Sequence, residues 1–540
     1  MATILGTFSN AVQQTLYPKI DEVQAEISPT WKSLFKNSSN VYRPYWGQNW
    51  LVRKVFKTGL AGSANFDKVG QATVGWNTDT SISGTSAQSP NFTNYGTGAQ
   101  SVWQTPGQSV NPGYHQWVFP LWKMLGTAYI PLDLIRAAEQ GANIYDEAEG
   151  IVEGTAMNVA YQRANAFFAE TSTLTTATTS YVVTFPGCVL GEFDPATTAI
   201  SALADQNALQ VTLTAGAIAR FEDGLPVDIF VSKTATDNLV CVNYNSSRIP
   251  AFINVVDGTA DTIQIVNLSG SAFLTAANTS GQKALIVPWK AVDITNASGN
   301  WGAGSSGVMT IAGTATAPVL LPHGIERILV STGTLYGDYT ASSGINVDRF
   351  KWAKSYLPGA VGSALDRTLL VRYIARMVHG RKYRRKMPNL FLTTEGAFAA
   401  YTESVNGFEA RQAQGQRMDF SDEGISEDIN FNAFGYRMSV RSDPFIGKGK
   451  LYGICAEDEN WKVHMPPRLR NTVTGKSFDP GVEFVAPLLG ANSYLQGVKS
   501  STGATTDMLE MPFYLLYNIV PDYIPGMKLT SVGESYGAAS

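Results

Sequence analysis

A dense basic run, RKYRRK, occupies residues 381–386, where five of the six side chains are Arg or Lys. Such a run can bind phosphates or pair with carboxylates. Tyr383 is the one aromatic residue within it, and no second basic strip adjoins it in the sequence. These features favour an ionic contact. A solvated loop and a contact with nucleic acid are the alternatives.

An acidic run follows at residues 419–428 and includes Asp419, Asp422 and Glu423. It lacks the D-x-[DN]-x-[DN]-G spacing of a calcium loop, so we expect no metal there. Solvation, or ionic pairing with the basic run, explains it better.

The four histidines lie in four separate segments, and no acidic partner stands at metal-ligand spacing from them. We therefore expect a structural or surface role for each and no metal site. They are His115, His323, His379 and His464.

Two glycine-containing stretches match phosphate-binding motifs only as text. GAGSSG at 302–307 leads into the strand-like VMTI instead of opening a helix whose N-terminus could hold a phosphate. TGKS at 474–477 has Arg470 where the first glycine of a phosphate loop belongs, and FDPG follows it. Neither stretch predicts nucleotide binding.

The sequence offers no nucleophile in a recognisable setting. It contains no G-x-S-x-G, and Cys188, Cys241 and Cys455 lie far apart without a C-x-x-C pair. We predict no catalytic residue, no cofactor and no disulfide framework. The protein is not expected to be an enzyme.

Composition bounds the remaining options. The chain has 540 residues, a formal net charge of -4 and 16% charged residues, against about 25% in typical proteins. Its length predicts about two to four cores, and its uncharged polar residues suit broad contact surfaces. No signal-peptide pattern and no apolar run of membrane-spanning length is present, so we expect neither export by the usual route nor a membrane location.

The N-terminal part predicts one helix and one long polar loop. Leu16, Ile20, Val23 and Ile27 recur at helical spacing, and Pro29 stops the pattern. The strand-like runs NWLVRKVFK, from Asn49, and HQWVFPLWKM, from His115, flank a stretch dominated by Gly, Ser, Thr, Asn and Gln. A polar loop of this length predicts an arm that reaches away from its own core.

A long helix and a β-rich region follow. A stripe from Ile144 to Ala160 predicts the helix, and its small residues, Gly154 among them, predict a close neighbour. Short β-type runs then recur about every ten residues from 171 to 330, typical of an all-β sandwich or barrel. Because helical pattern resumes with SALDRTLLVRYIARMVHG, where Ser363 is the expected N-cap, the β-rich region looks inserted.

The order of these pieces resembles the major capsid protein of tailed bacteriophages, which has the Hong Kong 97 (HK97) fold. The resemblance rests on GTLYGDYTASSGINVDRFKW, MPNLFLTTEGAFAAY, FNAFGYRMSVRSDPFIGKGKLYGI and LEMPFYLLYNIVPDYIPGMKLTSV, which occur in the family's order. It implies an α+β fold with an N-terminal arm, an extended β loop (E-loop), a spine helix, and peripheral (P) and axial (A) domains, to which this chain adds an inserted all-β domain.

The resemblance divides the chain into seven parts. They are the arm (1–45), the extended β loop with flanking strands (46–125), the spine helix of the P-domain (126–170), the inserted β-barrel or sandwich (171–335), the P-domain (336–405), the A-domain (406–505) and the C-terminal P-domain strands (506–540).

The function implied by the resemblance is self-assembly through hexamers and pentamers into an icosahedral virion shell. The shell would enclose double-stranded DNA without sequence-specific binding, be built in the host cytoplasm, and draw on scaffolding, portal and decoration proteins. The alternatives are an encapsulin-like bacterial nanocompartment, a β-rich surface adhesin and an intracellular hydrolase. The larger β insertion and long loop favour the virus over the nanocompartment.

Candidate residues for contacts between subunits follow from this reading. They are Trp50, Trp76 and Trp103 in or near the loop, Arg381, Lys382, Arg384, Arg385 and Lys386 in the basic run, and Asp419, Asp422 and Glu423 in the acidic run. Some family members crosslink a loop lysine to a neighbouring asparagine. Lys54, Lys57 and Lys68 lie in the right region, but the sequence identifies no partner, so we do not expect crosslinking.

Overall fold

The structure is a computed structural model of the whole chain. It describes residues 27–35, 41–42, 51–58, 113–131, 144–175, 182–194, 208–233, 238–241, 244–245, 247–248, 250–257, 261–267, 283–294, 308–309, 314–335, 345–348, 353–379, 387–412, 428–456, 460–466, 469–470, 477–478, 482–484, 497–499 and 505–534. The chain divides into two compact units, one made of Met1–Val52 and Phe119–Ser540 and the other of Arg53–Val118.

The first described helix, α2 (Pro29–Leu34), is short and begins at a proline. Pro29 lacks the N–H that would be unpaired at this position, and the Ser28 hydroxyl accepts a hydrogen bond from the Trp31 N–H at 3.3 Å. The predicted helix that ends before Pro29 includes Ile27, which is helical; its earlier residues lie outside the described residues.

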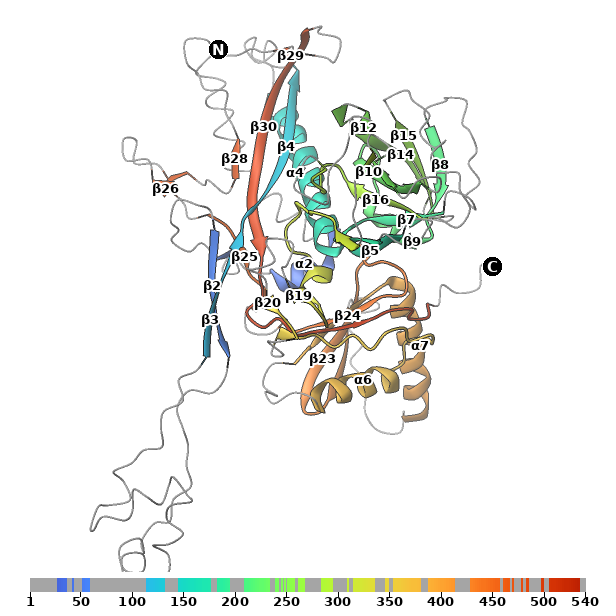
Figure 1. Cartoon of the computed structure of the whole chain (residues 1–540). Coiled ribbons are helices and arrows are strands. Elements are labelled where there is room, and N and C mark those ends of the chain that lie inside the picture. Colours follow the sequence, from blue (N-terminus) through green and yellow to red (C-terminus); the bar gives the residue numbers. More distant parts are fainter. Residues whose placement is uncertain are drawn as a thin grey trace, which may run out of the picture. The chain divides into compact units, whose positions relative to one another are not determined.

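The two strand-like runs that flank the polar loop are strands. β2 (Leu51–Thr58) and β3 (Gly113–Pro120) form a two-stranded sheet (Figure 1). The run from His115 holds two strands instead of the single one predicted, because Leu121 interrupts it after Pro120. Residues 59–112, the predicted loop, lie outside the described residues.

Two long strands pair along most of their length in a six-stranded sheet. β4 (Trp122–Pro131) and β30 (Thr505–Ile519) are antiparallel, in register from Trp122↔Tyr517 to Pro131↔Met508 (Figure 1). The apolar run MPFYLLYNIV (511–520) predicts a strand buried on both faces. All of it except Val520 lies in β30, and Leu515 and residues 517–520 are buried. The other strands are β1 (Val41–Tyr42), β25 (Val463–His464), β28 (Val482–Phe484) and β29 (Gly497–Lys499).

The predicted long helix is α4 (Ile144–Phe168). Its C-terminal half is buried: Val159, Ala160 and residues 163–168 are all inaccessible to solvent or nearly so. A close neighbour was predicted at the small residues, but at Gly154 the described part of this chain brings nothing within 4 Å. A close approach occurs elsewhere, at the end of the helix, where a Cβ on Gly324 would meet the Ala166 carbonyl at 2.5 Å.

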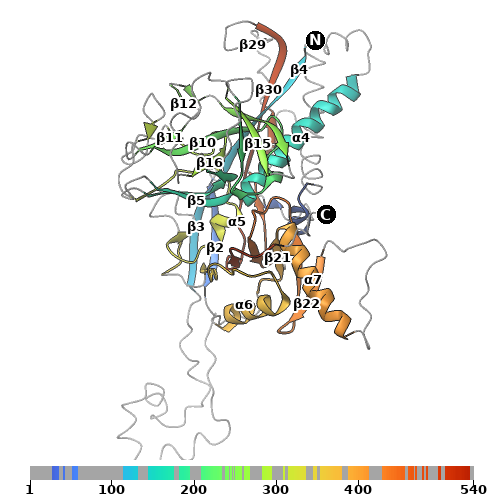
Figure 2. The same cartoon turned by 90° about the vertical axis from the view of Figure 1, so that its right-hand side faces the viewer.

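Strands dominate the described residues between 171 and 335, as the spacing of the β-type runs predicts (Figure 2). The runs YVVTF, LQVTL, VDIFV, LVCVNY, TIQIVNL and ALIVPW each overlap a strand. A nine-stranded sheet has the order β8-β15-β14-β10-β16-β7-β9, with β11 paired to β10 and β17 paired to β11. On β16, Leu285 and Val287 join one apolar core while Ala284 and Ile286 join a second, so this sheet is buried on both faces.

A three-stranded sheet, β18-β6-β5, contributes Leu174, Val183 and Phe185 to the first of these cores. The elements of the whole region are β5 (Glu170–Thr175), β6 (Val182–Val189), β7 (Gly191–Phe193), β8 (Ala208–Thr212), β9 (Ala215–Gly216), η4 (Ile218–Arg220), β10 (Pro226–Lys233), β11 (Asn238–Cys241), β14 (Ala251–Asp257), β15 (Thr262–Asn267), β16 (Ala284–Pro288), β17 (Val308–Met309), β18 (Thr314–Thr316) and α5 (Ile325–Ile328).

A five-stranded sheet with two helices forms a further core. Its order is β22-β23-β21-β24-β31, and its strands are β21 (Leu390–Thr393), β22 (Asp428–Ala433), β23 (Tyr436–Ser442), β24 (Leu451–Ile454) and β31 (Met527–Leu529). The helices α6 (Arg367–His379) and α7 (Glu395–Gln412) share one hydrophobic cluster with it. The sequence predicts one apolar face of α6 with Leu369, Leu370, Tyr373, Ile374 and Met377, and of these Leu370, Ile374 and Met377 are buried.

The predicted start of α6 is wrong. Ser363 is not its N-cap, because the Ser363 carbonyl accepts a hydrogen bond from the Gly533 N–H at 2.8 Å and Ala364 bridges Gly533. These bonds hold the chain extended at this point. The helix begins after Asp366, whose carboxylate accepts the Leu369 N–H at 2.6 Å in the manner of an N-cap.

Three small strand pairs complete the described elements. They are β12 (Tyr244–Asn245) with β13 (Ser247–Arg248), β19 (Thr334–Leu335) with β20 (Ile345–Asn346), and β26 (Leu469–Arg470) with β27 (Ser477–Phe478).

Candidate functional site: a buried charge junction and the loop beside it

The eleven residues predicted to make contacts between subunits all lie outside the described residues. They are Trp50, Trp76, Trp103, Arg381, Lys382, Arg384, Arg385, Lys386, Asp419, Asp422 and Glu423. Their roles stay predictions. The side chains of Lys54, Lys57 and Lys68 are likewise outside what the structure describes.

The histidine and cysteine side chains that the structure describes are buried in the protein interior. His323 and His464 are about 1% exposed, and all three cysteines are free and buried. Burial raises the pKa of Cys188 to about 12, although the charge of Arg327 opposes the shift. This thiol is therefore protonated at neutral pH and is not a nucleophile.

The two glycine motifs lead into strands, not helices. GAGSSG is followed by β17, and TGKS runs into β27 at Ser477. Neither has the helix N-terminus that binds phosphate. Within the described ranges, no group of three or more His, Cys, Asp or Glu side chains could hold a metal ion. Those ranges also contain no helix long and apolar enough to cross a membrane.

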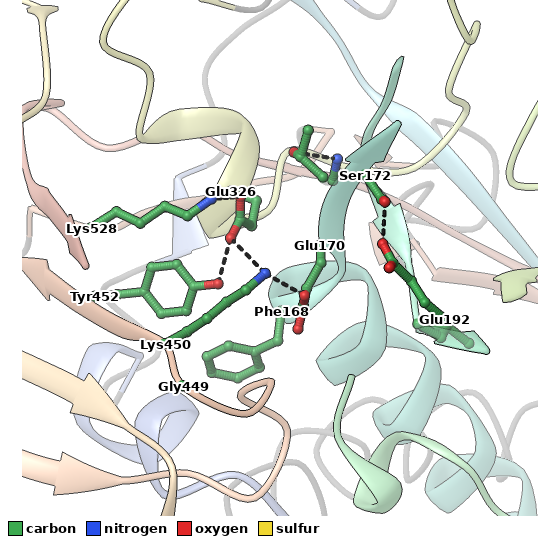
Figure 3. A network of polar contacts seen from close by, with 12 residues as sticks. Phe168, Glu170, Ser172, Glu192, Glu326, Gly449, Lys450, Tyr452 and Lys528 are labelled. Carbon is green, nitrogen blue, oxygen red and sulfur yellow. Dashed lines mark hydrogen bonds and ion pairs between the residues drawn. The ribbon is translucent and has the colours of Figure 1, made fainter. Parts of the chain in front are cut away.

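A cluster of charged side chains is buried where the end of α4, the β-rich region and the five-stranded sheet meet. Figure 3 shows the Lys450 ammonium between two carboxylates. It forms a short ion pair with Glu170, and its Nζ lies 3.5 Å from Glu326 Oε1. Lys528 Nζ lies 2.5 Å from Glu326 Oε2, and the Tyr452 hydroxyl donates to Oε1 at 2.6 Å. With Arg220, we call this set the charge junction.

Glu326 is ionised in this setting. Burial opposes its ionisation, but the charges of Lys450 and Lys528 and the hydrogen bonds from Lys528 and Tyr452 outweigh burial and lower its pKa to about 2. Burial and the nearby negative charges of Glu326 and Glu170 raise the pKa of Tyr452 well above 10. The phenol therefore remains a hydrogen-bond donor at every physiological pH.

Arg220 joins the junction to the β-rich region. Its side chain is fully buried, and one guanidinium nitrogen lies 3.0 Å from Glu170 Oε1. The guanidinium also donates to the carbonyls of Phe445 (2.7 Å), Leu190 (3.0 Å) and Phe168 (2.9 Å). A planar group with five N–H donors suits such a site, because it can bind several acceptors from different elements at once.

The loop between β23 and β24, residues 443–450, runs beside the junction. At Gly447 a Cβ would lie 1.6 Å from Glu170 Oε1, so only glycine leaves room for that carboxylate. Lys448 forms an ion pair with Asp261 of the β-rich region, and its N–H lies 3.5 Å from the Gly216 carbonyl. Gly449 donates its N–H to Glu534 at 2.7 Å.

The other end of this loop holds the N-terminal residues 28–35, which we call the anchor segment. One oxygen of buried Asp443 accepts the Ser28 hydroxyl at 2.7 Å and the Thr30 N–H at 3.2 Å. Its other oxygen accepts the Phe445 N–H at 3.0 Å. Burial raises the pKa of Asp443, and these hydrogen bonds oppose the shift.

An aromatic contact completes the anchor. The Trp31 ring lies 4.5 Å from the Arg163 guanidinium carbon and packs edge-on against Phe167 of α4, with ring centroids 5.9 Å apart. A desolvated cation over an indole contributes about 2 kcal/mol or more. The anchor segment is thus fixed both to α4 and to the loop after β23.

The charge junction cannot perform catalysis as it stands. Its carboxylates are bonded to cations, its tyrosine donates to Glu326, and these side chains are largely withdrawn from solvent. What it can do is orient elements. Sequence reasoning missed it because its members are far apart in the chain. One local signal was available: Glu326 and Arg327 interrupt the apolar stretch GIERILV, a pattern typical of a buried ion pair.

Comparisons with known proteins give weak likenesses. No family model matches the chain, and no curated protein matches its sequence. Among solved structures, it is similar to a chain of the cyanophage A-1(L) capsid asymmetric unit, with 10% identity, a TM-score of 0.34 and coverage of 93% of this chain and 92% of that chain. It is also similar to the SrpI encapsulin of Synechococcus elongatus, with 13% identity, a TM-score of 0.19 and coverage of 34% and 56%.

The first of these neighbours belongs to a phage capsid and the second is an encapsulin.

Proposed function

We propose that this chain is a structural subunit that assembles with copies of itself into a closed protein shell. The shell would be the head of a tailed bacteriophage, built from hexamers and pentamers around double-stranded DNA. Scaffolding, portal and decoration proteins are the further partners that this function implies. The order of sequence signatures described above supports this assignment.

The observation that carries the proposal is the unit Arg53–Val118. In the described part of the chain, β2 and β3 pair only with each other. An isolated two-stranded sheet is at best marginally stable in water. Between the strands, residues 59–112 contain only Asp67, Lys68 and Asp79 as charged residues. Charge repulsion therefore does not oppose contact of this segment with another protein surface. A neighbouring copy would supply contact surface for this sheet.

The test is a deletion that removes the connection but keeps the strands. Residues 59–112 are replaced by Asn-Gly, which closes β2 and β3 as a tight hairpin. We expect soluble subunits whose urea unfolding matches that of the wild type and which form no closed particles in negative-stain electron microscopy. Normal shells from this variant would contradict the proposal.

Particle contents distinguish the phage head from a nanocompartment. Nuclease-protected DNA in particles from the native source supports a phage head, whereas a packaged enzyme without DNA supports an encapsulin-like shell. The wild-type particles themselves must be closed shells tens of nanometres wide. A chain that remains monomeric at every concentration and salt condition would rule out both.

The basic run at 381–386 has a role of its own in this proposal. We infer an ionic contact between subunits, with the acidic run at 419–428 as its partner. Arg384→Glu with Arg385→Glu should then prevent assembly and leave the subunits folded. Restoration of assembly by Asp419→Lys with Asp422→Lys would support the pairing. Normal particles that package little DNA would assign the run to the genome instead.

A further inference from the structure

The 443–450 loop contacts parts of the chain that are distant in sequence. At its start, Asp443 binds Ser28 and Thr30 of the anchor segment. In its middle, the Phe445 carbonyl accepts a hydrogen bond from Arg220 at 2.7 Å. Near its end, Lys448 pairs with Asp261 and Gly449 donates to Glu534. An eight-residue loop therefore touches the N-terminal residues, the β-rich region and the C-terminal residues.

Few of the loop's own bonds fix its shape. The Ile446 N–H donates to the Asp443 carbonyl at 3.1 Å and Phe445 N–H to the Asp443 side chain, whereas its other contacts come from elsewhere in the chain. Gly447 and Gly449 add backbone freedom, and Gly449 has a φ of +68°. The conformation of the loop thus depends on the groups that bind it.

We propose that this loop couples the anchor segment to the β-rich region, so that docking of Ser28 on Asp443 tightens the hold of Phe445 on Arg220. Asp443 and Phe445 are two residues apart and joined by their own hydrogen bond of 3.0 Å. A shift of Asp443 therefore moves the carbonyl that Arg220 binds. This coupling is a property of the single subunit and does not depend on shell assembly.

Coupling of this kind is reciprocal, because each contact must change the other by the same free energy. It therefore has two independent tests. Loosening the anchor segment should loosen the β-rich region near Arg220. Loosening the loop from the β-rich region should loosen the anchor segment.

Hydrogen exchange followed by mass spectrometry measures both directions on the full chain. Ser28→Ala removes the hydroxyl that donates to Asp443. We expect amide exchange at residues 215–221, which Ser28 does not touch, to become about fivefold faster. In the reverse direction, Lys448→Ala with Asp261→Ala should also accelerate exchange of the Thr30 and Trp31 amides, by less than fivefold because this ion pair is exposed.

The matched control is Asp366→Ala. It removes an N-cap of comparable strength from α6, at a position with no contact to the 443–450 loop among the bonds described. It should accelerate exchange at the start of α6 and leave residues 215–221 and 30–31 unchanged. The coupling is excluded if the Ser28 effect stays within residues 27–35 and 443–446, or if only one of the two directions responds.

Discussion

Glu326 and Asp443 are both buried carboxylates near the same loop, yet their surroundings shift their pKa values in opposite directions. Two ammonium groups face Glu326, and its pKa falls to about 2 despite burial. Asp443 receives its hydrogen bonds from the Ser28 hydroxyl and from backbone N–H groups, and burial raises its pKa. The first site stabilises a full negative charge, whereas the second tolerates one.

This difference predicts that the charge junction is more stable than the contact between the anchor segment and Asp443. In the charge junction three cations surround two buried carboxylates, so the loss of a carboxylate leaves buried cations without a partner. At Asp443 the anchor segment is held by hydrogen bonds to one carboxylate, and a single lost bond there costs about 1 kcal/mol. We therefore expect the contact at Asp443 to loosen more easily than the charge junction, while Trp31 keeps the anchor segment on α4.

The largest effect should come from Lys450→Met. Without this ammonium, Glu170 loses one of its two cations and Glu326 one of its two, while both carboxylates remain buried. Each carboxylate keeps one cation, so the cost is that of two charge-assisted contacts, about 1.5–3 kcal/mol each, which urea unfolding of unassembled subunits would measure.

Lys448→Met is the matched control, because Lys448 pairs with Asp261 but its side chain is 47% exposed. An exposed pair contributes less than about 1 kcal/mol. If both substitutions lowered the free energy of unfolding equally, the charge junction would contribute no more to stability than an exposed ion pair.

The next effect is a pH dependence carried by Glu326. Its folded pKa lies below its ordinary value of 4.5, so its ionised form stabilises the fold. This contribution is complete above pH 4.5 and disappears as the pH falls toward 2. Its size is about 3 kcal/mol, from the difference between the two pKa values. The destabilisation caused by Glu326→Gln should therefore be largest at neutral pH and shrink in acid. A constant difference across this range would contradict the ionised state of Glu326.

Asp443 should show the opposite sign. Its folded pKa is raised, so the folded state binds the proton more tightly than the unfolded state does. Its titration adds stability below its ordinary pKa of 3.8, and this contribution is lost as the pH rises through the folded pKa. Asp443→Asn leaves one donor without an acceptor and costs about 1 kcal/mol at pH 7. That cost should grow in acid, where the Glu326→Gln cost shrinks; parallel pH profiles would remove the distinction.

The two regions also show what sequence reasoning can and cannot reach. The strands β10 and β16 were predictable, because an apolar run bounded by turn residues is a local signal. The start of α6 was not, since the bonds from residues 360–364 to the chain near Gly533 exist only in the folded chain. Dense charge was easy to find at 381–386, whereas the charge junction assembles from single charged residues brought together by tertiary folding.

The smallest expected effect concerns an exposed aromatic residue in the turn between β22 and β23. Phe434 is 51% exposed and has a φ of +52°, and Gly435 follows with +80°. Left-handed backbone costs a residue with a side chain about 1 kcal/mol, and two-residue hairpin turns of this kind favour Asn before Gly. Phe434→Asn should thus stabilise the unassembled subunit by about 0.5–1 kcal/mol, seen as a higher melting temperature. No stabilisation would mean that the Phe434 ring contributes packing within the subunit that offsets its backbone strain. A gain in stability together with weakened assembly would show that the ring is retained for contact with another copy.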